Sequence, residues 1–184
     1  LNYGFPLPSI YEAFNARVES NFQNWWSEKL EEKEIDIDLK FLSNTIYFAR
    51  LATMVQGLLF IEHISSAENL EINLKEVLQN WSAGCIIRSD LLKELGNINL
   101  SNTITSSEFV RNMLLENLDY IKEVIKQCTD GNISIPVITS SYNWFVSTSN
   151  SFNPSSLIQA QRDYFGAHQV QLSDSDEFTH LDWD

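Results

Sequence analysis

One long apolar segment, Leu39 to Ile64, constrains the fold more than any other feature of this sequence. Its apolar residues would fall on nearly every side of a helix instead of forming one stripe. Such a helix has to be covered by other elements, so the sequence predicts a central buried helix in an all-α domain. Gln56 and Gly57 are its main interruptions, and we expect Gly57 to allow a close approach of a neighbouring helix.

Length and charge limit the classes of function. A chain of 184 residues is long enough for one domain with a substantial core. No uninterrupted apolar run reaches the roughly 18 to 20 residues of a membrane span. The formal net charge is −13, with only 12 Lys and Arg residues, which argues against a nucleic-acid surface. We therefore expect a soluble, cytoplasmic protein with no membrane or nucleic-acid partner, and the absence of an initiator Met suggests a piece of a longer protein.

A first helix is predicted ahead of the central one. Ser9 and Glu12 have the spacing of a capping box, which places the helix start near residue 9. Four apolar residues then follow at intervals of four and form one stripe, which we expect to pack on something substantial: Ile10, Phe14, Val18 and Phe22. The acidic stretch from Glu28 to Asp38 is interpreted as a solvated helix end and linker.

Further helices are predicted after the central one. Trp81 to Leu95 is interpreted as a loop entering a helix, and a second capping box, Thr105 to Glu108, precedes one long amphipathic helix closed by Gly131. The segment from Ile138 to Val146 fits either a short helix or an extended stretch. Asn153 and Pro154 open a last short helix, Ser155 to Ala167, and an acidic tail follows.

The residues that carry chemistry are few. The sequence has no metal-binding motif, no Gly-rich phosphate loop and no nucleophile elbow. Cys85 and Cys128 are expected to be reduced, buried thiols. The candidate anion ligands are Arg17, Arg162 and His168, although pattern alone favours a surface ion pair of Arg162 with the adjacent Asp163.

A resemblance changes this interpretation. The segment LIQAQRDYFGAH, residues 157–168, closely resembles the carboxy-terminal signature of 6-phosphogluconate dehydrogenases. Trp81 followed by GCIIRS at 84–89, the segment 6–17 and the closing residues 178–183 are similar to further blocks of that family, in the same order. The resemblance covers essentially the whole chain, although Ser82 and Ala83 stand where the family usually has a basic residue and a Gly.

The resemblance implies an all-α, carboxy-terminal helical domain of the 6-phosphogluconate dehydrogenase type, spanning residues 1–168. Residues 169–184 would be an extended tail that docks on the partner subunit of a homodimer. Arg17 would bind the substrate phosphate in its own subunit. Arg162 and His168 would enter the partner's site, Arg162 on the phosphate and His168 on the sugar acid of 6-phosphogluconate.

The family's catalytic Lys and Glu, and the Rossmann domain that binds NADP, would lie upstream of Leu1. No catalytic, cofactor-binding or metal-binding residue is therefore expected on this chain, which alone would be inactive. The implied function is the carboxy-terminal part of an NADP-dependent enzyme that decarboxylates 6-phosphogluconate to ribulose 5-phosphate. Two alternatives stay open: a stand-alone dimerisation or sugar-phosphate-binding module, and an enzyme for another sugar phosphate, with NADP or NAD undecided.

Overall fold

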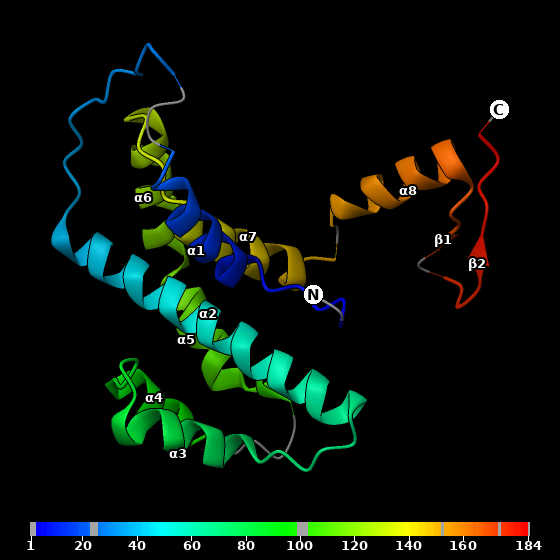
Figure 1. The fold of residues 1–184 in the computed structure, drawn as a ribbon, viewed down its shortest axis with the longest axis horizontal. Helices are drawn as coiled ribbons and strands as arrows, with labels where there is room; N and C mark the ends of the chain where they lie inside the picture. Colours follow the sequence, from blue (N-terminus) through cyan, green and yellow to red (C-terminus); the bar gives the residue numbers. More distant parts are fainter. Residues whose placement is uncertain (1–2, 23–25, 99–102, 152, 173, 184) are drawn as a thin grey trace. The chain divides into compact units, whose positions relative to one another are not determined.

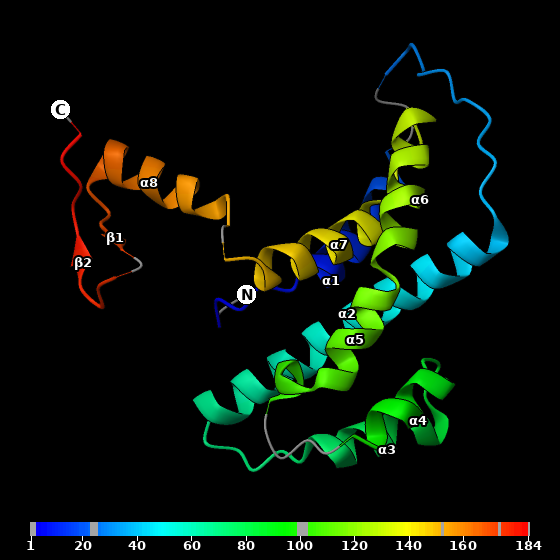
Figure 2. The same cartoon turned by 180° about the vertical axis from the view of Figure 1, so that it is seen from behind.

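The computed structural model describes residues 3–22, 26–98, 103–151, 153–172 and 174–183. The chain divides into two compact units, Leu1–Trp144 and Phe145–Asp184. Helices make up most of the described chain (Figures 1 and 2), which confirms the all-α prediction. In the described part of the chain, no helix combines the length and the apolarity that crossing a bilayer requires.

The first unit is built on α2 (Leu39–Ala67), the central helix that the sequence predicts. Asp38 caps it by accepting a 2.7 Å hydrogen bond from the Lys40 amide. Its buried side chains share one face and include Phe48, Leu51, Val55 and Leu58. The helix is not buried all round, however: Leu39 is 81% exposed, and Ile46 is exposed as well.

Shorter helices cover the buried face of α2. The helix α6 (Leu118–Asp130) packs along it most extensively, and α3 (Leu74–Gly84) and α4 (Asp90–Gly96) pack against each other. Figures 1 and 2 show α3 and α4 side by side beneath α2. Between α4 and α6 the chain forms η1 (Ile104–Ser106) and α5 (Glu108–Glu116). Trp81 lies within α3, so the loop predicted to start there begins only after Gly84.

The helix α1 (Pro8–Glu19) begins where the sequence predicts, but without the capping box. Leu7 occupies the N-cap position and Pro8 the first helical position, where its missing N–H costs nothing. Ser9 is buried inside the first turn. Its amide donates to Gln56 Oε1 at 3.1 Å, and its hydroxyl accepts from Gln56 Nε2 at 2.8 Å. Ser9 therefore anchors α1 to α2 instead of capping α1.

The long helix predicted after residue 108 is two helices. Ser107, and not Thr105, caps α5 by accepting from the Val110 amide at 3.4 Å. The helical pattern breaks at Asn117, whose side-chain amide donates to the Met113 carbonyl at 2.8 Å. Gly131 closes α6, as predicted.

The glycine that permits a close approach is Gly131, not Gly57. A Cβ at Gly131 would lie 2.6 Å from Ile35 Cγ2, whereas one at Gly57 would meet only the Trp81 ring, at the ordinary distance of 3.9 Å. A backbone hydrogen bond joins the same two segments, because the Lys33 amide donates to the Gly131 carbonyl at 3.1 Å. The acidic linker is thus fastened to the end of α6.

The helix α7 (Pro136–Ser149) starts in the first unit and ends in the second, so the segment left open by the sequence is helical. The second unit continues with α8 (Ser155–Gly166), opened by Asn153 as predicted: its side-chain oxygen accepts from the Ser155 amide at 3.0 Å. The tail forms a short antiparallel pair, β1 (Val170–Gln171) with β2 (Phe178–Thr179). The division at residue 168 into a helical domain and a docking tail stays a prediction.

Candidate functional site

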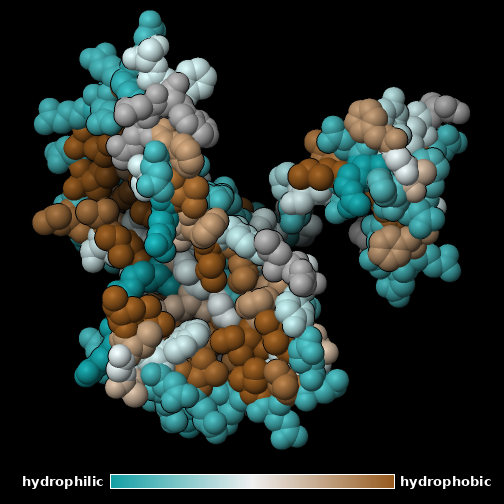
Figure 3. All heavy atoms as spheres, in the orientation of Figure 1, coloured by the Kyte–Doolittle hydropathy of each residue, from teal (hydrophilic) through white to brown (hydrophobic). Residues whose placement is uncertain are grey.

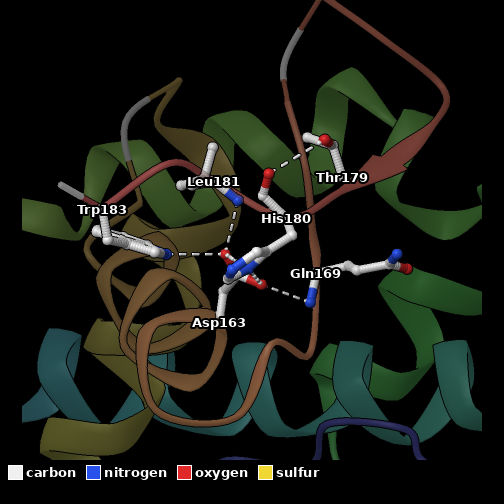
Figure 4. Close-up of polar contacts among 6 residues, drawn as sticks. All are labelled: Asp163, Gln169, Thr179, His180, Leu181 and Trp183. Atoms are coloured by element: carbon white, nitrogen blue, oxygen red, sulfur yellow. Dashed lines mark hydrogen bonds and ion pairs between the residues drawn. The ribbon is translucent and has the colours of Figure 1, made fainter.

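Asp163 organises the carboxy-terminal unit. Its side chain is 0% exposed and accepts hydrogen bonds from four donors (Figure 4). The donors are the Gln169 amide at 2.7 Å, His180 Nδ1 at 2.9 Å, the Leu181 amide at 2.9 Å and Trp183 Nε1 at 3.1 Å. These five residues are called the Asp163 cluster below.

The charge state of Asp163 follows from this cluster. Burial alone would raise the pKa of its carboxyl group, but the hydrogen bonds, led by that from His180, stabilise the ionised form more strongly. The pKa of Asp163 therefore lies well below its usual range. Asp163 is an anion at every physiological pH, and its charge is already engaged by N–H donors.

Arg162, the residue before Asp163, points its guanidinium group elsewhere. It is exposed, and its Nη1 donates to Gln159 Oε1, one helical turn earlier, at 3.0 Å. Among the described residues it forms no ion pair, so the surface pair with Asp163 that pattern alone favours is wrong. The other guanidinium N–H groups of Arg162 remain available to an anion.

His168 is held close to the end of α8 by an unusual turn. Ala167 and Gln169 both have left-handed backbones, with φ of 49° and 63°. The His168 ring folds back over Gly166, where an added Cβ would lie 3.0 Å from ring atoms Cδ2 and Nε2. Gly166 is thus the residue that leaves room for the ring.

Arg17 belongs to the first unit. It is exposed in the last turn of α1, and its carbonyl accepts a 2.7 Å hydrogen bond from Ser20 Oγ. Within the described residues its guanidinium group has no hydrogen bond or ion pair. Its joint action with Arg162 and His168 stays a prediction.

Two hollows in the surface are apolar and involve none of the three candidates. One, of about 400 Å³, lies in the first unit beside Gly57 and Trp81, with Arg50 at its edge. The other, of about 700 Å³, lies in the second unit between α8 and the tail, lined by residues that include Leu157, Val170 and Phe178.

In the described residues there is no group of His, Cys, Asp and Glu side chains suited to a metal ion. The two thiols differ, since Cys128 is buried, as predicted, whereas Cys85 is exposed.

Sequence patterns identify the three candidate ligands but miss the Asp163 cluster. Its donors follow Asp163 by 6 to 20 residues, in a segment without helical period. No local spacing rule connects such positions. A weak signal exists in retrospect: His180 and Trp183 are the polar-tipped rings of a tail that otherwise consists mainly of small, acidic and aliphatic residues.

Comparison with known proteins agrees with the sequence signature. The family described as "6-phosphogluconate dehydrogenase, C-terminal domain" matches residues 1–183. The chain is 30% identical over 199 residues to the decarboxylating 6-phosphogluconate dehydrogenase of Synechocystis sp., covering 100% of this chain and 41% of the relative. It is also 30% identical to the Staphylococcus epidermidis enzyme, of which it covers 42%.

A solved structure extends the comparison to the fold. The 6-phosphogluconate dehydrogenase of Plasmodium falciparum superposes with a TM-score of 0.76 at 26% sequence identity. The match covers 98% of this chain and 42% of that one. The Plasmodium enzyme was solved in its apo form, with its cofactor NADP+ and with its substrate 6-phosphogluconate. The present chain spans about two fifths of the length of these relatives.

Proposed function

Because this chain belongs to the 6-phosphogluconate dehydrogenase C-terminal domain family, we propose that it supplies the substrate-phosphate site and the dimer scaffold of a decarboxylating 6-phosphogluconate dehydrogenase. The parent reaction would convert 6-phosphogluconate to ribulose 5-phosphate, with a Lys base and a Glu acid from outside this chain.

One observation carries the proposal: Arg162 presents an exposed guanidinium group on α8 that bonds only to Gln159 among the described residues. A planar Arg fork binds a phosphate through two parallel N–H···O bonds. In a protein of net charge −13, fixed cations are needed to hold a dianion. Arg162 and Arg17 would therefore bind the phosphate, while His168, with its ring folded over Gly166, would bind the sugar acid.

The nucleotide cofactor does not fit the described residues. A Rossmann site requires a parallel sheet with a Gly-rich turn entering a helix. The strands described here are two antiparallel pieces of two residues each, and the sequence has no such Gly-rich turn. In this proposal NADP is bound outside the chain, and none of the residues described above acts on it.

The dimer scaffold is supported by an exposed apolar surface. The stripe predicted on α1 is only partly covered by the first unit: Phe14 is 65% exposed, and Ile10, Val18 and Phe22 are exposed as well. Figure 3 shows apolar residues gathered on the visible face of the first unit. Contiguous apolar surface of this kind is typical of an interaction site, and we assign it to a second subunit together with the tail.

The test is a calorimetric titration of the purified chain with 6-phosphogluconate. Loss of a bidentate phosphate contact in Arg162→Ala should weaken binding by about 1.5 to 3 kcal/mol, or roughly 10- to 100-fold. Arg111→Ala is the matched control, since Arg111 is an exposed arginine of α5. Equal affinity of wild type and Arg162→Ala would contradict the phosphate role. A chain that self-associates but does not bind 6-phosphogluconate would be a dimerisation module only.

A further inference from the structure

We propose that Asp163 is the positioning residue of this site: its buried carboxylate fastens the turn that carries His168, and the tail that follows, to the end of α8. The inference rests on the proposed function only for the identity of the ligand. Asp163 itself would not touch the substrate, because it is fully buried and its oxygens are occupied by the four donors of the cluster.

The turn that carries His168 has an unusual backbone. A non-glycine residue with positive φ is uncommon, and two of them on either side of His168 need an interaction that holds them. The Gln169 amide donates to Asp163 Oδ1 at 2.7 Å, the shortest bond of the cluster. The Asp163 carboxylate thus bonds to Gln169, the residue directly after His168. Arg162 is the residue directly before Asp163. Each candidate ligand is therefore adjacent in sequence to one partner of this hydrogen bond.

The far end of the tail binds the same carboxylate. Three of the four donors lie there: His180 through its ring, Leu181 through its amide and Trp183 through its indole N–H. The Trp183 ring also packs edge-on against Tyr164, with ring centroids 5.5 Å apart. Figure 4 shows Trp183, Leu181 and His180 gathered around the Asp163 carboxylate. The carboxylate therefore joins helix, turn and tail.

An aspartate at position 163 suits the four donors better than an asparagine would. An ionised Asp is an acceptor only, and its two oxygens offer about four acceptor positions for the four N–H donors. Asn has nearly the same shape but a single acceptor oxygen, and its NH2 group would face N–H donors. Asp163→Asn is therefore expected to release the cluster without creating a cavity.

Solution NMR of the isotopically labelled full chain tests the positioning directly. We expect wild type to show a cross-relaxation contact between the His168 ring and the Gly166 α-protons, and slow exchange of the Gln169 and Leu181 amides. Asp163→Asn should lose the contact and exchange these amides at least about tenfold faster, with unchanged helical circular dichroism. Absence of the contact in wild type, or its persistence in Asp163→Asn, would overturn the proposal. Trp183→Phe, which keeps a ring against Tyr164 but removes one donor, gives a milder loss if Asp163→Asn does not fold.

A rescue pair at His180 separates positioning from general stability. His180→Asn keeps an N–H donor near the place of Nδ1, whereas His180→Ala removes it. Affinity for 6-phosphogluconate should fall at least about tenfold in Asp163→Asn and less in His180→Ala, and return towards wild type in His180→Asn. Equal binding by wild type and Asp163→Asn would refute positioning. If wild type does not bind 6-phosphogluconate while the NMR results hold, the proposed function fails and the positioning by Asp163 stands.

Discussion

At the scale of single residues, two buried polar side chains behave in opposite ways. Asp163 has a full set of donors, which makes its burial favourable. Thr45 is 0% exposed in α2, and its hydroxyl has no hydrogen-bond partner among the described residues. A buried, unpaired hydroxyl is a cost, because it has lost water without gaining a partner. Substitutions of these two residues should therefore change stability in opposite directions.

Replacing Thr45 by Val should stabilise the first unit. The substitution removes the unpaired hydroxyl and keeps a β-branched side chain of similar shape, so we expect the free energy of unfolding to rise by about 1 kcal/mol. Thr53→Val is the matched control on the same helix, because Thr53 Oγ1 donates to the Ala49 carbonyl at 2.8 Å. Urea unfolding measures both, and a destabilised Thr45→Val would show that the hydroxyl has a partner.

Acid should release the Asp163 cluster only at a pH well below the usual pKa of an Asp side chain. The pKa of Asp163 is lowered on folding, so its contribution is fully present above the unfolded value of about 4 and is lost as pH falls through the folded value. The carboxyl-carbon signal of Asp163 should therefore keep the position of the ionised form from pH 7 down to about 4. A protonation shift of that carbon signal above pH 4 in wild type would contradict this account, and Asp163→Asn, which lacks the carboxyl group, is the control.

The residue scale also shows what sequence can identify. Arg162, His168 and Arg17 are found from the resemblance, because they lie in segments that match blocks of the family. Asp163 lies inside one of these segments, yet its role depends on donors as far away as Trp183, 20 residues later. Only the folded path of the tail shows that these residues meet.

At the scale of elements, the sequence predicts helices where an apolar period and a boundary residue coincide. The start of α1, the extent of α2, the end of α6 at Gly131 and the opening of α8 at Asn153 all follow from such signals. The break at Asn117 does not, because the apolar period continues across it from α5 into α6. Ser9 shows a second limit: its capping pattern is present, but a buried hydrogen bond to Gln56 determines its place.

The Ser9 network should contribute measurably to the position of α1. Ser141 Oγ donates to the Val137 carbonyl at 2.8 Å, so the 2.9 Å bond between the two hydroxyls is donated by Ser9. Ser9→Ala would leave Gln56 Nε2 and Ser141 Oγ buried without this partner, at a cost of about 1 to 3 kcal/mol in the free energy of unfolding. Ser82→Ala is the control, since that hydroxyl only bonds within its own helix. Equal losses in thermal or urea unfolding would refute a special role of the network.

At the scale of the whole molecule, the first unit exposes apolar surface that its own helices leave uncovered. Leu39 and Ile46 on α2 and Phe14 on α1 are exposed although their positions follow an apolar pattern. The sequence predicts burial for all of them and cannot specify which chain provides it. We propose that a second subunit covers part of this surface, and that Arg17 of one subunit shares a site with Arg162 and His168 of the other.

A mixing experiment tests that shared site most directly. Arg17→Ala and Arg162→Ala chains are titrated with 6-phosphogluconate separately and then as an equimolar mixture that has exchanged subunits. Each variant alone should bind weakly, whereas the mixture should recover tight binding at about one site per four chains, because half of the dimers are mixed and each mixed dimer has one intact site. A mixture that binds no better than its components would contradict a site built from two subunits.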